Sequence, residues 1–424
     1  MGGEWAMKGW ELCTVLAVLL ASFVLGLGSA QAASGGERWI VIFDDTVNEA
    51  ARENIIRGAG GVIIKDLSLV NGKAVLLPLQ AASALGRVSG VVRVDLDVIV
   101  ETYGKPTNPG KPPKEEEPQP AQGLPWGVNR IDAEYAWSYS TGSGMPVAIL
   151  DTGIDLDHPD LSVVGGYNAV NPKKSPDDDN GHGTHVAGIT AALNNEIGVV
   201  GVAPDVALYA VKVLNRKGFG FLSDVIDGLG WCVDNGMRVV NMSFGTSDDV
   251  QSFHDAVIAA NDAEVIQVAA AGNTAGVVGY PAAYDETIAT SATDSTDALA
   301  TFSGYGPEID IAAPGVDIYS TYKGGGYETL SGTSMAAPHV TGTAALVLAM
   351  GLTVETGYGL QTDDDLKAEV LTYLGDPYYG EGLVDAEDSV NGDATLEGDD
   401  LSTGAAKPLP RAVSTWGRIK SLFR

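Results

Sequence analysis

Residues 147–151 read Val147-Ala148-Ile149-Leu150-Asp151, four consecutive apolar residues that run directly into an aspartate. A continuous apolar run of this kind is typical of a strand buried on both faces, as in a parallel sheet covered by helices. Similar runs alternate with helix-like segments further along the chain. The other strand candidates are 208–213, 239–242, 265–269 and 288–290, and helix candidates include 222–235 and 252–262. The alternation predicts an α/β fold for residues 121–390, a parallel sheet with helices on both faces.

The sequence on either side of this region predicts a precursor. Residues 1–33 combine Lys8, a mainly apolar run and small residues ending at Ala33, the pattern of a signal peptide. Residues 34–103 carry strand-like and helix-like runs in the order of a small α+β sandwich, among them a closing extended stretch at 91–100. Residues 104–120 contain six prolines and are expected to form a linker. Residues 391–424 form a polar and then basic tail.

Composition excludes several classes of partner. The 424 residues include 55 acidic and 25 basic ones, for a formal net charge of −30. Such a surface repels nucleic acid and anionic membranes, so we expect neither as a partner of the main body. The basic tail could dock on a membrane, but trimming after secretion is the simpler expectation. Only Cys13, in the signal peptide, and Cys232 are present, so the exported chain has no internal disulfide.

Polar residues stand at the ends of three predicted strands. Asp151 ends the first, Ser243 follows residues 239–242, and Asn273 comes shortly after residues 265–269. In open parallel sheets, binding and catalytic sites form at the carboxyl ends of the strands. Two more candidates, His182 and Ser334, begin helix-like segments.

A serine hydroxyl becomes a strong nucleophile when a base removes its proton and a third group orients that base. The chain has five histidines. His182 is flanked by Gly181 and Gly183, which let a substrate backbone approach, and it is the best candidate for the base. The other four have simpler interpretations: His158 on the surface, His254 at a polar helix start, His185 as a structural hydrogen-bonder, and His339 pointing about 140° away from Ser334 on one helix.

In the chain order Asp, His, Ser, these residues resemble the subtilisin family of serine proteases. The match rests on Asp-Thr-Gly-Ile-Asp at 151–155, His-Gly-Thr-His-Val-Ala-Gly at 182–188, Gly-Thr-Ser-Met-Ala-Ala-Pro-His-Val at 332–340 and Ala-Ala-Gly-Asn at 270–273. The resemblance covers residues 121–390 and implies a secreted endopeptidase. Ser334 would attack the scissile carbonyl, His182 would take its proton, Asp151 would orient the imidazole, and Asn273 would donate to the oxyanion.

The resemblance also implies where the substrate lies. Residues Ser243-Phe244-Gly245 and Ala270-Ala271-Gly272 would pair with the peptide by strand addition and wall the first specificity pocket. Gly279 would form the floor of that pocket and leave it deep and uncharged. Leu222 and Val225 would line a further apolar subsite. A preference for large apolar residues before the cut follows.

A structural calcium site is the third implication. The family pattern places side-chain oxygens at Gln122, Asp160 and Asn195, and backbone carbonyls at Leu193, Ile197 and Val199. Six oxygen ligands suit Ca²⁺ far better than Zn²⁺. No His-Glu-x-x-His motif is present, so a zinc protease is not indicated.

Residues 34–103 resemble the pro-domain that accompanies these proteases as both chaperone and inhibitor. Residues 94–103 match its extended tail, so we expect self-processing after Tyr103. Because a proline-rich linker follows, a second trim near Ala121 is also expected. The expected partners are protein and peptide substrates and the chain's own pro-domain, with the mature enzyme a monomer.

Two alternatives from other classes were weighed. A lipase or esterase would order its triad Ser, Asp, His, and the only histidine after Ser334 is His339, so the chain order excludes it. A binding or scaffold protein that kept the fold and lost activity is the other alternative. Labelling with a fluorophosphonate distinguishes that protein from an enzyme.

Overall fold

The computed structural model describes residues 36–103, 105–106, 119–351, 361–362 and 382–391, and it divides into two compact units. Of these, residues 36–65 and 73–96 form the smaller unit, and residues 66–72 together with everything from Asp97 onward form the larger one. Residues 97–103 thus pack with the larger unit, although the expected processing site lies after them. The expected signal peptide, most of the linker and the tail beyond Asn391 lie outside the described residues.

The smaller unit is built on a four-stranded sheet in the order β2-β3-β1-β4. Its elements are β1 Glu37–Phe43, α2 Glu49–Gly58, β2 Val62–Leu67, β3 Gly72–Leu77, α3 Leu79–Leu85 and β4 Val91–Leu96. β1 and β4 pair antiparallel with Val41 opposite Val94. The core consists of Val41, Phe43, Ile56, Val75, Leu77, Ala82 and Leu85. This is the α+β arrangement that the run of strand-like and helix-like segments predicts.

The larger unit contains a seven-stranded sheet in the order β15-β14-β13-β11-β7-β9-β8, with every neighbouring pair parallel. Its strands are β7 Pro146–Asp151, β8 Val163–Asn168, β9 Ala207–Lys212, β11 Val239–Met242, β13 Ile266–Ala270, β14 Ile288–Thr293 and β15 Ile311–Pro314. All five strands predicted from apolar runs lie in it. The central strands β7 and β11 are fully buried apart from Pro146, as a sheet covered on both faces requires.

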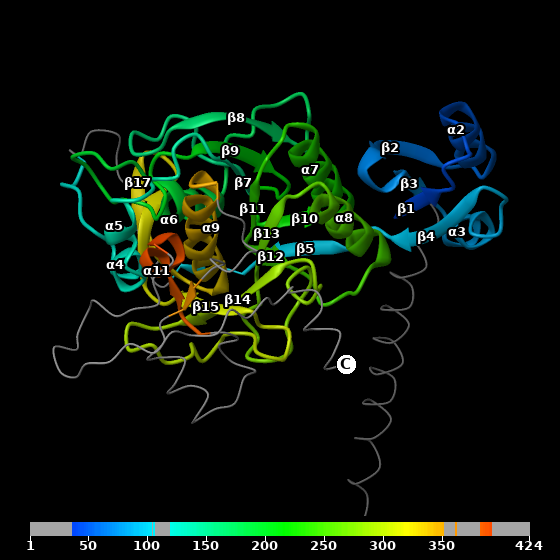
Figure 1. Cartoon of the computed structure of the whole chain (residues 1–424). Coiled ribbons are helices and arrows are strands. Elements are labelled where there is room, and N and C mark those ends of the chain that lie inside the picture. Colours follow the sequence, from blue (N-terminus) through cyan, green and yellow to red (C-terminus); the bar gives the residue numbers. More distant parts are fainter. Residues whose placement is uncertain (1–35, 104, 107–118, 352–360, 363–381, 392–424) are drawn as a thin grey trace, which may run out of the picture. The chain divides into compact units, whose positions relative to one another are not determined.

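Helices cover this sheet. α6 (His182–Ala191) packs against α9 (Thr333–Ala349), and α7 (Leu222–Asp234) packs against α8 (Gln251–Asp262), so each pair covers one face (Figure 1). Shorter helices, α4 (Trp126–Arg130), α5 (Ala133–Ala136) and α11 (Ala386–Asn391), lie beside the first pair. The predicted α/β class is therefore confirmed. Within the described residues, none of the helices has the length and apolar character needed to cross a bilayer.

Two small sheets flank the large one. The predicted extended stretch 91–100 is divided between β4 and β5 (Ile99–Thr102), and β5 lies between β10 (Phe219–Phe221) and β12 (Phe244–Gly245). The other small sheet has the order β16-β17-β6, from Ile318–Tyr322, Gly326–Ser331 and Lys105–Pro106. Both sheets lie at the edge where the candidate site forms, and each contains a short strand from residues 99–106. A two-stranded ladder, β18 (Gln361–Thr362) with β19 (Val384–Asp385), completes the described strands.

Candidate active site

The carboxyl edge of β7 brings an aspartate and a histidine together. Asp151 is the last residue of β7 and His182 the first of α6. Nδ1 of His182 lies 2.8 and 2.9 Å from the two carboxylate oxygens of Asp151. Both side chains are buried, and the backbone N–H of Thr152 donates to Asp151 Oδ1 at 2.7 Å. Because a carboxylate only accepts, the contact assigns a proton to Nδ1 of His182, and in the neutral imidazole Nε2 then carries the lone pair. Nε2 makes no hydrogen bond within the described chain.

A buried carboxylate beneath this pair fixes the start of α6. Asp178 accepts hydrogen bonds from the backbone N–H groups of Asn180, Gly181 and Thr184 and from the hydroxyls of Thr152 and Thr184. Burial raises the pKa of Asp178, and these hydrogen bonds oppose the rise. The first N–H groups of a helix have no partner within it. In α6, Asp178 accepts from Thr184, Asn180 Oδ1 accepts from His182 at 3.0 Å, and Thr152 Oγ accepts from Gly183 at 2.9 Å. The His182 backbone is thereby held in place.

The glycines around His182 are required by close contacts. Gly181 has φ +117°, and a Cβ there would lie 2.3 Å from the ring of Tyr322. A Cβ at Gly183 would lie 2.1 Å from the carbonyl oxygen of Gly153. The His-Gly-Thr-His pattern therefore reflects close packing of α6 against the end of β7.

Ser334 is the second residue of α9 and is buried. Its Oγ donates to the carbonyl oxygen of Ser243 at 2.8 Å and accepts from the backbone N–H of Tyr103 at 3.1 Å. The Ser243 hydroxyl in turn donates to the carbonyl of Ser334 at 2.9 Å. The candidate nucleophile and the candidate base are thus not hydrogen-bonded to each other here, and rotation about the Ser334 Cα–Cβ bond would have to precede proton transfer.

Asn273 is held by one end of its amide. Its Oδ1 accepts from the backbone N–H and the hydroxyl of Thr333, both at 3.0 Å. This arrangement leaves Nδ2 as the end that can donate to another group. Since Thr333 immediately precedes Ser334, the same residue connects the amide to the serine backbone.

Residues 99–103 lie in this site as an extended peptide. β5 pairs antiparallel with β12, Phe244 opposite Thr102 and Gly245 opposite Glu101, and with β10 on its other side. The Tyr103 N–H points to the carbonyl of Ser243 at 3.4 Å as well as to Ser334 Oγ. The second flanking strand is β10, whereas we had expected Ala270-Ala271-Gly272 to pair with the peptide.

The Tyr103 side chain fills a pocket walled by three glycines. A Cβ at Gly245 would lie 2.2 Å from the Tyr103 hydroxyl oxygen, one at Gly279 2.6 Å from it, and one at Gly272 3.8 Å from the ring. Residues 270–272 thus contribute a pocket wall through Gly272. Burial raises the pKa of the Tyr103 hydroxyl, which therefore stays neutral. The pocket accommodates a whole aromatic ring because none of these three positions carries a side chain.

Further along the peptide, Val100 is fully buried and pairs with Gly220. Leu222 and Val225, at the start of α7, are also fully buried. The N–H of Leu222 donates to the carbonyl of Val98 at 2.9 Å, so the start of α7 lies beside the upstream part of the peptide.

The residues expected to bind calcium lie together. Nε2 of Gln122 donates to the carbonyls of Leu193 (2.9 Å) and Val199 (3.3 Å), and Nδ2 of Asn195 donates to Asp160 Oδ1 (2.8 Å). Ile197 N–H donates to Asn195 Oδ1 at 2.7 Å. To present oxygen to a cation, both amides have to turn over, which exchanges two atoms of nearly equal size.

The charge of this group also fits a cation. Asp160 is fully buried, and burial raises its pKa against the hydrogen bonds from Val199, Asn195 and Tyr327. A desolvated carboxylate among carbonyls and amides is stabilised by a hard cation. The group contains one formal charge, and no cluster of three or more His, Cys, Asp or Glu side chains suited to a metal occurs in the described ranges.

The remaining histidines are structural. His158 was expected on the surface, but it is buried and its Nε2 contacts the carbonyl of Gly326 at 2.9 Å. Burial lowers the pKa of His185 to about 3 and that of His339 to about 4. His339 Nδ1 lies 2.8 Å from the carbonyl of Met335, directed away from the serine. Nε2 of His254, a residue of α8, lies 2.9 Å from a carboxylate oxygen of Glu286.

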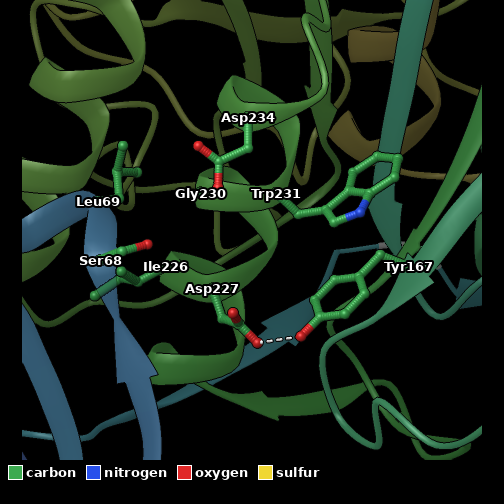
Figure 2. A pocket seen from close by; sticks show the side chains of 8 residues that line it. All are labelled: Ser68, Leu69, Tyr167, Ile226, Asp227, Gly230, Trp231 and Asp234. Atoms are coloured by element: carbon green, nitrogen blue, oxygen red, sulfur yellow. Dashed lines mark hydrogen bonds between the residues drawn. The ribbon is translucent and has the colours of Figure 1, made fainter.

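A pocket of about 220 Å³ lies beside α7 (Figure 2). Its lining is Ser68, Leu69, Tyr167, Ile226, Asp227, Gly230, Trp231 and Asp234. Tyr167 donates to Asp227 Oδ2 at 3.0 Å and stacks on Trp231, with ring centroids 6.1 Å apart. The pocket contains none of the expected site residues.

Three features of the site were not predicted. β10 has only three residues, Phe219-Gly220-Phe221, whose alternation is too short to identify a strand. The hydrogen bonds from Thr333 to Asn273 and from Thr152 to Asp178 join residues far apart in sequence. A search for Ser and Thr next to each candidate catalytic residue could have found these two threonines.

Comparisons with known proteins agree with this geometry. A model of the Subtilase family matches residues 142–372. Subtilisin NAT of Bacillus subtilis subsp. natto is 39% identical over 394 residues, which cover 90% of this chain and 98% of the relative. Subtilisin Savinase of Lederbergia lenta is 48% identical over 269 residues, 63% of this chain and 98% of the relative. A thermostable alkaline protease of Halalkalibacterium halodurans is 47% identical over 272 residues, 63% of this chain and 73% of the relative.

Proposed function

Because the chain belongs to the subtilase family and is a subtilisin-like serine endopeptidase, we propose that Asp151, His182 and Ser334 are its catalytic triad. The family acts on protein substrates, and the residues that would do so here follow from the site. The observation that carries the proposal is the position of Tyr103, whose N–H lies 3.1 Å from Ser334 Oγ while its ring fills the glycine-walled pocket.

Each step of the reaction has a residue to perform it. Ser334 Oγ turns from the Ser243 carbonyl to Nε2 of His182 and loses its proton to that nitrogen. It then attacks the carbonyl carbon of the scissile peptide bond. Asp151, bonded to Nδ1, stabilises the imidazolium that results. His182 then gives the proton to the leaving amine, and water repeats the sequence on the acyl-enzyme.

Asn273 would donate Nδ2–H to the oxygen that becomes negative, together with the backbone N–H of Ser334. Its position is supported by the two hydrogen bonds from Thr333 to its Oδ1. Loss of such a donor lowers kcat by about 10²–10³, the range measured on a subtilisin.

We propose that the enzyme cuts its own precursor after Tyr103 and that residues 34–103 act as chaperone and inhibitor. Residues 105–106 support this, because Lys105 pairs with Ser331 and Pro106 with Leu330 on the far side of Ser334. Pairing of the chain both before and after Gly104 supports cleavage between Tyr103 and Gly104. Purified Ser334→Ala precursor should remain intact, and cleavage after Tyr103 in that variant would refute self-processing.

The proposed specificity is for large apolar and aromatic residues before the cut. Tyr103 occupies the pocket of Gly245, Gly272 and Gly279, and because none of these three wall residues carries a charge, the pocket supports a preference based on size and not on charge. The fully buried Val100, four residues upstream counting Tyr103 as the first, indicates a second apolar requirement.

We further propose a structural Ca²⁺ bound by Gln122, Asp160, Leu193, Asn195, Ile197 and Val199. When bound, the ion supplies charge compensation and cross-linking, and it takes no part in the chemistry. Its ligands would join the segment at Ala121–Gly123, bridged to Ile197 and Val199, to Asp160 in the connection between β7 and β8. Export through the predicted signal peptide, a second trim near Ala121 and a monomeric mature enzyme complete the proposal. Sequencing the amino terminus of the secreted product tests the two boundaries.

A further inference from the structure

The first turn of α7 is capped by a segment distant in sequence. Phe221, the residue before the helix, has an apolar side chain that cannot accept a capping hydrogen bond. Instead the N–H of Leu222 donates to the carbonyl of Val98 at 2.9 Å. Both oxygens of Asp97 accept from Ser223, one from its N–H and one from its hydroxyl, each at 2.8 Å. The Asp97 carboxylate is almost fully buried there and the Ser223 side chain completely so.

Asp97 belongs to the same extended peptide that lies in the active site. Tyr103 is the first residue before the proposed cut, so Asp97 is the seventh. The residues between them are held at every step: β5 pairs with β10 and β12, and the Thr102 N–H donates to the carbonyl of Gly218 at 3.0 Å. With no slack in this segment, the distance between the cut and the first turn of α7 is set by a fixed number of residues.

We propose that the amino end of α7 in the processed enzyme is a subsite for a carboxylate side chain seven residues before the scissile bond. The inference rests on the proposed function, because departure of the residues up to Tyr103 is what vacates the position of Asp97 beside Ser223. A substrate whose seventh residue is aspartate takes the place of Asp97.

The chemistry of the subsite selects an acid over other side chains. Its N–H and O–H donors are each matched by one carboxylate oxygen, and the positive end of the helix dipole adds to the attraction. An asparagine can accept from the N–H and donate to the Ser223 hydroxyl, so it retains the geometry with weaker neutral bonds. An alanine retains nothing. The expected order is therefore Asp, then Asn, then Ala.

A neighbouring charge limits the size of the effect. Asp224, in the same first turn, is also buried and repels a second carboxylate. We therefore expect kcat/KM for the aspartate peptide to exceed that for the alanine peptide by about tenfold and that for the asparagine peptide by about threefold. These factors lie in the lower part of the range for charge-assisted hydrogen bonds. The whole chain has a net charge of −30, so long-range electrostatics oppose an acidic peptide, and any preference for one has a local cause.

The test uses processed enzyme and synthetic peptides with the sequence of residues 96–103 followed by a neutral amide leaving group. The seventh residue before the cut is Asp, Asn or Ala, and a fourth peptide exchanges Asp97 and Val98 at constant composition. We expect the order above, with the exchanged peptide no better than the alanine one. Equal kcat/KM for all four would overturn the subsite and leave the proposed function intact. No cleavage after tyrosine in any peptide would overturn both.

Three enzyme variants sharpen the test, each through the ratio of kcat/KM for the Asp peptide to that for the Ala peptide. Ser223→Ala removes the hydroxyl donor and should lower the ratio to about threefold, while Ser223→Thr keeps the hydroxyl and should preserve it. Asp224→Asn removes the like charge and should raise it. An unchanged ratio in Ser223→Ala would place the preference elsewhere. If a variant does not fold, the wild-type peptide series decides alone.

Discussion

The glycine-walled pocket makes a sharp prediction that separates tyrosine from phenylalanine. A Cβ at Gly279 would lie 2.6 Å from the hydroxyl oxygen of Tyr103 but 3.7 Å from Cζ, the ring carbon that bears it. The first distance is well inside van der Waals contact and the second is an ordinary contact. Gly279 has no positive φ, so alanine fits its backbone. Gly279→Ala should therefore exclude the hydroxyl and admit the unsubstituted ring.

The magnitude follows from the overlap. Overpacking a close-fitting site costs about 1–3 kcal/mol. Applied to the transition state, that cost lowers kcat/KM for substrates cut after tyrosine by about 5–150-fold. Phenylalanine substrates should change by less than about threefold, since the only tight new contact is with the carbonyl of Thr246, 3.2 Å from the added Cβ.

The assay compares paired peptides that differ only in tyrosine or phenylalanine before the cut. Gly245→Ala is the matched variant, because its Cβ would lie 2.7 Å from ring carbons Cε2 and Cζ and should exclude both residues. Gly276→Ala, whose Cβ would meet only Thr274 at 3.7 Å or more, is the inert control. Equal losses on tyrosine and phenylalanine in Gly279→Ala, or no loss on either, would show that Tyr103 does not mark the specificity pocket.

Three further predictions concern the support of the site and the stability of the fold. With free calcium at a hundred times its Kd, the free energy of unfolding of the mature enzyme should be about 2.7 kcal/mol higher than that of the chelated enzyme. The difference in Tm between the two conditions should shrink in Asp160→Asn. Persistence of the full difference in that variant would show that the ion binds elsewhere. Thr333→Val removes one of two bonds to Asn273 and should lower kcat/KM by about 2–13-fold; unchanged kinetics would mean that Asn273 needs no such anchor. Because burial lowers the pKa of His185 to about 3 and of His339 to about 4, the unfolded chain takes up protons below pH 6.5 that the folded chain does not. Denaturant unfolding of Ser334→Ala enzyme should thus show stability falling from pH 6.5 toward 4, by up to about 1.4 kcal/mol per pH unit for each histidine; a flat profile would contradict their burial as neutral side chains.

The sequence was most informative where local pattern and fold coincide. The apolar run that ends at Asp151 is enough to predict a buried parallel strand, and polar residues at the ends of parallel strands predict where a site forms. Those arguments, with the motifs around Asp151, His182 and Ser334, account for the α/β class and for the choice of candidate residues.

Other features depend on contacts between distant residues, which a single sequence does not encode locally. The sequence around Thr333 does not predict its hydrogen bond to Asn273. The sequence around Asp97 does not predict that this side chain caps a helix that begins 125 residues later at Leu222. His158 follows an acidic, turn-like segment and so suggests the surface, yet the β16–β17 hairpin covers it through Gly326. Residues 91–100 form strands in two different sheets because Asp97 and Val98, between the two strands, accept hydrogen bonds from the first turn of α7.

The identity of the nucleophile is the claim on which the rest depends, and covalent labelling tests it most directly. Processed enzyme is treated with a fluorophosphonate, and the modified peptide is identified by mass spectrometry. We predict one phosphonyl group per chain, on Ser334. Labelling of another serine, or full peptidase activity in enzyme that takes no label, would contradict the assignment of Asp151, His182 and Ser334 as the catalytic triad.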